Sequence, residues 1–123
     1  MRCSRFHLPW AFGLLTAMAS TLALSQTGQP IRIGVIGPFS GPSSDFGNPM
    51  LHGVQLAVEE INAVGGYLGR PLELVVKDDQ GNPDVGLKGS QELAKEGVVA
   101  TIGFCNTGVA AKSLDTYQNG QMP

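Results

Sequence analysis

The sequence has few of the residues on which enzymes and metal sites depend. Among its 123 residues, two are cysteine and two are histidine, and aromatic residues make up 7%. Both histidines precede Cys105, so no histidine follows this thiol to activate it as a nucleophile. Neither a Gly-x-Gly-x-x-Gly pattern nor a Gly-Lys-Ser/Thr phosphate loop is present. The sequence therefore predicts a protein that is not an enzyme and that uses no metal or cofactor.

Basic residues are also sparse. Residues 26–123 contain six basic and ten acidic residues, a formal net charge of −4, and the basic residues form no run. Because nucleic acids and anionic membranes are bound by clustered positive charge, this pattern argues against both as partners.

The N-terminus combines a short basic head with an apolar segment. Arg2 and Arg5 precede an uncharged stretch over residues 10–24. At about 15 residues this stretch is too short to span a bilayer comfortably, and it is typical of a secretion signal. We expect residues 1–25 to be a signal peptide cleaved after Ser25, which predicts a periplasmic protein. Cleavage after Ala19 and a retained membrane anchor are the alternatives.

Behind a polar lead over residues 26–30, strand-like and helix-like segments alternate. Asn-Pro pairs supply a capping oxygen and a proline that needs no donor at a helix start, and Gly65-Gly66 and Gly97 are helix ends. Three strands and three helices are predicted: strands Ile31–Gly37, Leu72–Val76 and Val98–Ile102, and helices opening at Asn48-Pro49, opening at Asn82-Pro83, and over Val109–Tyr117. The alternation indicates an α/β fold, a parallel sheet with helices on both faces.

Side-chain spacing indicates how the helices pack. Two apolar helix faces are expected: Met50, Val54, Ala57, Val58 and Ile61 in the first helix, and Ala110, Leu114 and Tyr117 in the third. Gly86 and Gly89 weaken the second helix by about 1 kcal/mol each relative to alanine, which indicates close packing or a loose segment. Residues 120–123 resemble the approach to a fourth strand. With so thin a core, we interpret residues 31–123 as the amino-terminal part of a longer protein.

The candidate binding site lies where the strands end. Ligands of open parallel sheets gather beyond the carboxyl ends of the strands, where neighbouring crossovers go to opposite faces. Here those ends are residues 37–48 and 103–108, both rich in Gly, Ser, Asn and Thr. We therefore expect a site between these two segments.

Three residues carry the chemistry expected of that site. A helix N-terminus attracts anions, Thr107 adds a hydroxyl donor, and Gly108 allows close approach of the backbone. Phe46 offers apolar area to an aliphatic side chain. This combination suits an aliphatic amino acid and equally a short carboxylic acid. As alternatives, Thr107 only caps its helix and Phe46 only packs on its own domain. Ser40 either contacts ligand or, the preferred reading, bonds only its own turn.

Other polar residues have simpler interpretations. Asp78-Asp79 is interpreted as polarity at a strand end beside a helix cap, and His52 as a surface or half-buried residue. Cys105 stands near a helix N-terminus, which would lower its pKa. In an oxidising compartment this single thiol is either buried or bonded to a partner outside this chain.

Three segments together resemble the opening of the leucine/isoleucine/valine-binding protein family. They are Ile-Arg-Ile-Gly-Val-Ile-Gly-Pro-Phe-Ser-Gly (31–41), Gly-Val-Gln-Leu-Ala-Val-Glu-Glu-Ile-Asn-Ala-Val-Gly-Gly (53–66) and Leu-Gly-Arg-Pro-Leu-Glu-Leu-Val-Val-Lys-Asp-Asp (68–79). Members are periplasmic solute-binding proteins of ABC importers, three to four times this length. The resemblance implies a truncated first lobe of the type I periplasmic binding fold, with the second lobe absent.

The resemblance also implies roles for individual residues. Phe46 falls where the family has a Trp or Tyr against the ligand side chain. Asn106-Thr107-Gly108 falls at the turn that holds the ligand α-carboxylate. The family's disulfide between the second and third strand loops is missing, because Gln80-Gly81-Asn82 replaces the partner of Cys105.

The function implied is capture of an amino acid, branched-chain or similar, or of a related small carboxylate or amide. A monomeric protein would deliver this ligand to an ABC permease in the inner membrane. A sensing receptor or regulator of the same fold, and a truncated fragment that binds nothing, are the alternatives.

Overall fold

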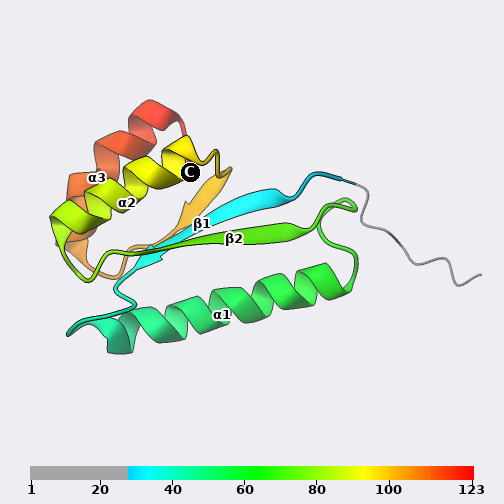
Figure 1. The fold of residues 1–123 in the computed structure, drawn as a ribbon, viewed down its shortest axis with the longest axis horizontal. Coiled ribbons are helices and arrows are strands. Elements are labelled where there is room, and N and C mark those ends of the chain that lie inside the picture. Colours follow the sequence, from blue (N-terminus) through cyan, green and yellow to red (C-terminus); the bar gives the residue numbers. More distant parts are fainter. Residues whose placement is uncertain (1–27) are drawn as a thin grey trace, which may run out of the picture.

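The computed structural model describes residues 28–123, which form three strands and three helices in strict alternation (Figure 1). The elements are β1 (Ile31–Gly37), α1 (Ser44–Ala63), β2 (Leu72–Asp78), α2 (Pro83–Lys95), β3 (Ala100–Ile102) and α3 (Thr107–Gly120). The predicted order of strands and helices is confirmed. The predicted signal peptide and its cleavage site at Ser25 lie outside the described residues.

The three strands form one parallel sheet in the order β2-β1-β3. Ile31 pairs with Leu72 at one end of β1 and Gly37 with Asp78 at the other. Helix α1 lies on one face of the sheet, and α2 and α3 lie together on the other (Figure 1). The predicted parallel sheet with helices on both faces is therefore confirmed. Because the chain leaves β1 and β3 toward opposite faces, the ends of these two strands form the switch point where such sheets bind ligands.

The first helix begins earlier than the sequence suggested. It starts at Ser44 rather than at Asn48-Pro49, so Pro49 lies inside it. The carbonyl of Ser43 accepts hydrogen bonds from the amides of Phe46 and Gly47, which forms a first turn ahead of the proline. Such a turn needs no side-chain cap, and the Ser43 side chain makes no capping bond. The helix ends as predicted, with Gly65 and Gly66 at positive φ.

The predicted apolar face of α1 points toward the sheet. Together with Ile33, Leu72 and Ile102 of the three strands, it lines a shallow groove of about 430 Å³ between helix and sheet. The residues of α1 that line the groove include all five of that face: Met50, Val54, Ala57, Val58 and Ile61.

Helix α2 packs closely on its neighbours, which decides between the two interpretations of its glycines. Asn82 caps the helix as predicted, accepting hydrogen bonds from the amides of Asp84 (2.8 Å) and Val85 (3.4 Å). A β-carbon added to Gly86 would lie 2.2 Å from Cγ1 of Val109, and one added to Gly89 would lie 3.0 Å from Cδ1 of Ile36. Both glycines therefore mark close packing rather than a loose segment.

Three other elements have boundaries that differ from prediction. Strand β2 runs to Asp78 instead of Val76, since pairing with β1 continues to Gly37. Strand β3 begins at Ala100 instead of Val98, although the amide of Val99 still bonds to the carbonyl of Arg32. Helix α3 begins at Thr107 instead of Val109 and continues to Gly120. The earlier start of α3 places Thr107 and Gly108 inside the first turn of this helix.

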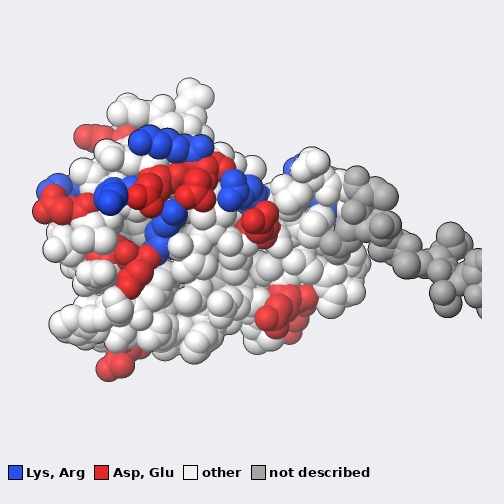
Figure 2. Space-filling model, viewed as in Figure 1, with Lys and Arg blue, Asp and Glu red and all other residues white. Residues whose placement is uncertain are grey.

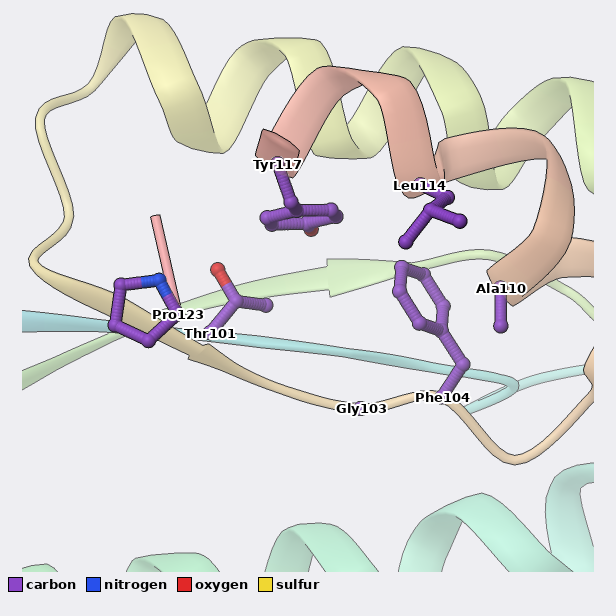
Figure 3. Close-up of a pocket in the computed structure, with 7 residues that line it drawn as sticks. All are labelled: Thr101, Gly103, Phe104, Ala110, Leu114, Tyr117 and Pro123. Atoms are coloured by element: carbon purple, nitrogen blue, oxygen red, sulfur yellow. The ribbon is translucent and has the colours of Figure 1, made fainter. Parts of the chain in front are cut away.

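The core lies between the sheet and α2. Ile36, Val75, Leu93 and Val98 are buried there, with Phe104 and Met122 packed against them. On the same side, the predicted inward residues of α3, Ala110, Leu114 and Tyr117, point toward β3 and line a pocket of about 220 Å³ (Figure 3). The carbonyl of Pro123, beside this pocket, accepts a hydrogen bond from the amide of Thr101. The last residues thus run beside β3, as expected for the approach to a fourth strand.

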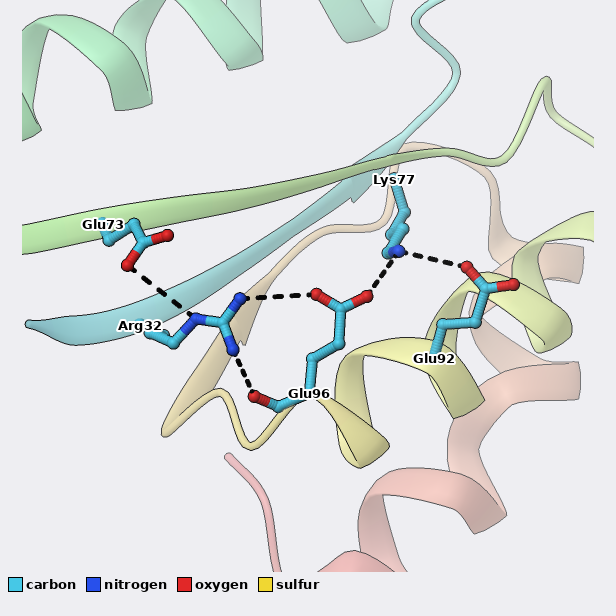
Figure 4. A network of polar contacts seen from close by, with 5 residues as sticks. All are labelled: Arg32, Glu73, Lys77, Glu92 and Glu96. Atoms are coloured by element: carbon cyan, nitrogen blue, oxygen red, sulfur yellow. Dashed lines mark hydrogen bonds and ion pairs between the residues drawn. The ribbon is translucent and has the colours of Figure 1, made fainter.

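An ionic network ties α2 to the two strands beneath it (Figure 4). Lys77 Nζ lies 2.7 Å from a carboxylate oxygen of Glu96 and 3.1 Å from one of Glu92. Arg32 donates to the carbonyl of Glu96 at 2.7 Å and lies 3.9 Å from the carboxylate of Glu73. On the face shown in Figure 2, basic and acidic side chains are intermixed over this region rather than gathered into a patch of one sign.

Candidate ligand-binding site

The loops at the carboxyl ends of the three strands meet at one edge of the sheet. A β-carbon at Gly81, in the β2–α2 loop, would lie 3.5 Å from Oγ of Ser43 and 3.7 Å from Oδ1 of Asn106. The β1–α1 loop and the start of α1 also approach the β3–α3 loop, since Sδ of Met50 lies 4.0 Å from Sγ of Cys105. The two segments that the sequence placed around a site therefore lie at the same end of the sheet.

Asp78 organises the β1–α1 loop. Its Oδ1 accepts hydrogen bonds from the amides of Phe39 (2.9 Å), Ser40 (3.3 Å) and Gln80 (3.0 Å), and its Oδ2 accepts one from the Ser40 hydroxyl. Burial by itself would raise the pKa of Asp78. The bonds from the Ser40 hydroxyl and the three amides outweigh this effect and hold the pKa below its ordinary value of 3.8.

These contacts bear on two predictions. Ser40 uses both its hydroxyl and its amide on Asp78 at the end of β2, so its partner lies outside the turn to which the preferred reading had confined it. Asp78 behaves as predicted, as polarity at a strand end. Its bonding to a loop 38 residues earlier was missed, and the adjacency of parallel strand ends is the only signal in the sequence that could have suggested it.

The next acid, Asp79, is fully buried at the junction of the loops. Its Oδ1 accepts a hydrogen bond from the amide of Gly81 at 2.7 Å, while its Oδ2 has no partner within residues 28–123. Burial raises the pKa of Asp79, which the Gly81 bond opposes and the charge of Asp78 reinforces.

The N-terminus of α3 is the group at this edge best suited to an anion. Asn106 occupies the capping position, but its side chain makes no capping bond within the described residues, and its buried Oδ1 has no partner there. In contrast, the matching residue of α2, Asn82, bonds to two amides of its helix. Thr107 and Gly108 follow in the first turn of α3, and both are exposed. The first amides of a helix lack intrahelical partners and carry partial positive charge, so this turn can hold a carboxylate.

Phe46 lies in the first turn of α1 rather than in a loop as expected. Its side chain is 73% exposed, so it makes little contact with the rest of the described chain. This exposure does not fit the alternative in which Phe46 packs on its own domain. Gly47 explains the position of this turn, because a β-carbon there would lie 2.2 Å from the carbonyl oxygen of Pro38.

The environment of Cys105 corrects one expectation. Its thiol was expected to have a lowered pKa because of the nearby helix N-terminus. Instead, burial of the sulfur and the negative charge of Asp79 raise the pKa of Cys105 above 9.0. Cys105 is a free thiol within the described chain and the residue is exposed, which does not fit the expected alternative in which this cysteine is buried, although its sulfur is partly withdrawn from solvent.

The described residues also bear on metals and membranes. Within residues 28–123, no three His, Cys, Asp or Glu side chains are grouped so that they could hold a metal ion. None of the three helices in this part of the chain is long and apolar enough to cross a bilayer.

Comparison with known proteins identifies the family. Residues 30–123 match the family model described as periplasmic binding protein. The chain is 35% identical over 106 residues to Leu/Ile/Val-binding protein homolog 3 of Brucella melitensis, covering 85% of this chain and 29% of that protein. It is 34% identical over 112 residues to Leu/Ile/Val-binding protein BraC3 of Rhizobium johnstonii, covering 86% of this chain and 30% of that protein.

Solved structures show the same fold. The branched-chain amino acid transporter substrate-binding protein LivJ of Streptococcus pneumoniae, in complex with isoleucine, superposes with a TM-score of 0.74. The two chains are 30% identical, and the match covers 76% of this chain and 27% of LivJ. A fatty acid ABC transporter substrate-binding protein of Thermomonospora curvata superposes with a TM-score of 0.72 at 26% identity, over 76% of this chain and 24% of that one.

The relatives that the chain matches are longer proteins. The chain spans less than a third of the length of the curated relatives that it matches. The matched region contains the whole described sheet, its helices and the loops at the strand ends. The chain belongs to the periplasmic binding protein family, and the curated relatives that it matches are named Leu/Ile/Val-binding proteins.

Proposed function

We propose that the protein is the solute-binding component of an ABC importer and captures an aliphatic amino acid outside the cytoplasm. The observation that carries the proposal is that the N-terminus of α3, which has no side-chain cap, lies at the same edge of the sheet as the start of α1, where Phe46 is exposed. Support also comes from the relatives named Leu/Ile/Val-binding proteins and from LivJ, which was solved with isoleucine.

In this proposal the ligand lies between the two loops. Its carboxylate accepts hydrogen bonds from the first turn of α3, where Thr107 adds its hydroxyl and Gly108 leaves room for close approach. Asn106 lies at the entrance to that turn. The ring of Phe46 covers the aliphatic side chain. A second lobe supplies the groups that hold the ammonium, closes over the ligand, and docks with the permease for release.

A second ligand class is favoured by one of the structural neighbours. The Thermomonospora curvata protein is named for fatty acid transport, and a fatty acid shares with an aliphatic amino acid a carboxylate and an apolar chain. The features at this edge of the sheet recognise those two groups. A small carboxylate without an ammonium is therefore the alternative ligand.

The test is isothermal titration of the full-length protein that carries this sequence. Isoleucine, leucine, valine, a short aliphatic amide and a short fatty acid are titrated separately. Binding of the amino acids supports the proposal, binding of the fatty acid alone supports the second ligand class, and binding of none contradicts both. Uptake of labelled isoleucine by cells with and without the gene then tests the importer role.

A substitution tests the site itself. Thr107→Ala removes the hydroxyl at the proposed carboxylate position and should weaken isoleucine binding by about 1–3 kcal/mol. Thr116→Ala, which removes a threonine hydroxyl later in the same helix, is the matched control. Equal affinity of Thr107→Ala and the unaltered protein for isoleucine would contradict the role of the Thr107 hydroxyl in binding the carboxylate.

A further inference from the structure

The Asp78 carboxylate joins two loops that the chain order separates. Asp78 ends β2 opposite Gly37, the last residue of β1, so its side chain stands at the point where the β1–α1 loop begins. It accepts the amides of Phe39 and Ser40 and the Ser40 hydroxyl from that loop, and the amide of Gln80 from the β2–α2 loop. Hydrogen bonds to an ionised acceptor are the stronger kind, so the three from the β1–α1 loop restrain that loop well.

The restraint extends to the first turn of α1. The amide of Ser44 donates to the carbonyl of Gly41 within the loop, and Gly47 packs against the carbonyl oxygen of Pro38. Phe46 lies between Ser44 and Gly47. The position of its ring therefore depends on the shape of the loop that Asp78 holds.

We propose that Asp78 is a positioning residue for ligand binding, which fixes the β1–α1 loop and thereby the place of Phe46. The claim that Asp78 affects ligand binding rests on the proposed function, whereas the claim that it fixes the loop does not. The bonds of Asp78 also determine the orientation of the ligand in the site. Because Asp78 occupies the amides of Phe39 and Ser40, these donors are closed to the ligand, whose carboxylate goes to Thr107 and Gly108 instead.

The role requires a carboxylate rather than a group of the same size. An ionised aspartate accepts hydrogen bonds at both oxygens and strengthens them by its charge, whereas asparagine offers one neutral acceptor oxygen and turns a donor NH₂ toward the Ser40 hydroxyl. Asp78→Asn therefore removes part of the restraint while it keeps the volume of the side chain. Asp115→Asn, on the exposed side of α3, is the matched control.

The first test needs no ligand. Amide hydrogen exchange is measured by NMR in the full-length protein. In Asp78→Asn, exchange at Phe39 and Ser40 should be about tenfold faster, while exchange at Val35 and Ile36 in β1 stays unchanged. Unchanged exchange at Phe39 and Ser40 would overturn the proposal. If Asp78→Asn does not fold, Ser40→Ala tests the same restraint. We then expect exchange of the residue 40 amide to be a few-fold faster, and unchanged exchange would overturn the proposal.

The second test uses isoleucine as the probe. Its Kd is measured at 25 °C on protein that circular dichroism shows to be folded at that temperature, so that a loss of stability alone leaves the Kd unchanged. Asp78→Asn should bind about tenfold more weakly, and equal affinity would overturn the positioning role while the proposed function stands. If the unaltered protein binds no isoleucine, the proposed function fails, and the exchange rates still decide whether Asp78 fixes the loop.

Discussion

The α-carbon of Gly86 in α2 faces the side chain of Val109 in α3 so closely that a β-carbon on Gly86 would lie 2.2 Å from Cγ1 of Val109. Val109 is fully buried and belongs to a helix that begins only two residues earlier. The contact therefore fixes the first turn of α3, the proposed carboxylate site, against α2.

Gly86→Ala should destabilise the protein. Alanine improves helix propensity by about 1 kcal/mol, but overpacking a close contact costs about 1–3 kcal/mol. Because Val109 is fully buried and cannot turn away into solvent, we expect the cost to exceed the gain. Urea unfolding of the full-length protein should show a lower midpoint.

The control is Gly53→Ala. Gly53 lies inside α1, and a β-carbon there meets nothing within 4 Å. Only the gain in helix propensity remains, so this substitution should stabilise the protein by up to about 1 kcal/mol. A stabilising Gly86→Ala would show instead that α2 and α3 move apart at little cost.

The fold was predictable because its signals are local. The Asn82-Pro83 pair indicates the start of a helix within two residues. The alternation of apolar strands with amphipathic helices indicates parallel strands joined by crossover helices. The start of α1 was misplaced because Asn48-Pro49 repeats the same pattern without its function. At the true start of α1 the backbone carbonyl of Ser43 accepts the first hydrogen bonds of the helix, and no side chain caps it, so the sequence carries no signal for this start.

The site was predictable only in outline. The rule for parallel sheets brings the β1 and β3 loops together, and the structure places both at one edge. The bonds from Asp78 to Phe39 and Ser40 were not predictable, because they join residues whose proximity depends on the register of β1 and β2. The raised pKa of Cys105 was missed for a similar reason, since its causes, burial and Asp79, arise only in the folded chain.

The Lys77 ion pairs should give stability that disappears at high pH. Hydrogen bonds with Glu96 and then Glu92 raise the pKa of Lys77 above its ordinary value of 10.5. A raised pKa means that the contribution is fully present below pH 10.5 and is lost as the pH rises through the folded-state value. Lys77→Gln should therefore cost about 1 kcal/mol at pH 7, and this difference should shrink above pH 10.5.

Urea unfolding at a series of pH values measures this difference. Lys88→Gln, which neutralises an exposed lysine on α2, is the control and should change stability little at any pH. A cost of Lys77→Gln that is the same at pH 7 and pH 11 would mean that its alkyl chain, and not its charge, stabilises the protein.

Phe46→Ala should affect binding far more than stability. The side chain is 73% exposed, so its removal should change the free energy of unfolding by no more than about 0.5 kcal/mol. If the ring covers the aliphatic part of the ligand, isoleucine affinity should fall about tenfold or more, equivalent to ~1.4 kcal/mol. Leu56→Ala, at a 58% exposed position farther along α1, should leave the affinity unchanged. Equal losses in both variants would exclude a specific role of the ring.

The alkylation rate of Cys105 shows which of two opposing effects on the pKa of its thiol is larger. A helix N-terminus favours the thiolate, whereas burial of the sulfur and the charge of Asp79 favour the protonated thiol and raise its pKa above 9.0. If burial and Asp79 prevail, iodoacetamide should alkylate Cys105 at pH 8 more slowly than it alkylates a cysteine in an unstructured peptide. The rate should continue to rise above pH 9, and it should reach the peptide value once urea unfolds the protein. Alkylation faster than that of the peptide would mean that the dipole of α3 dominates, and the same dipole would then favour a ligand carboxylate more strongly than the geometry alone suggests.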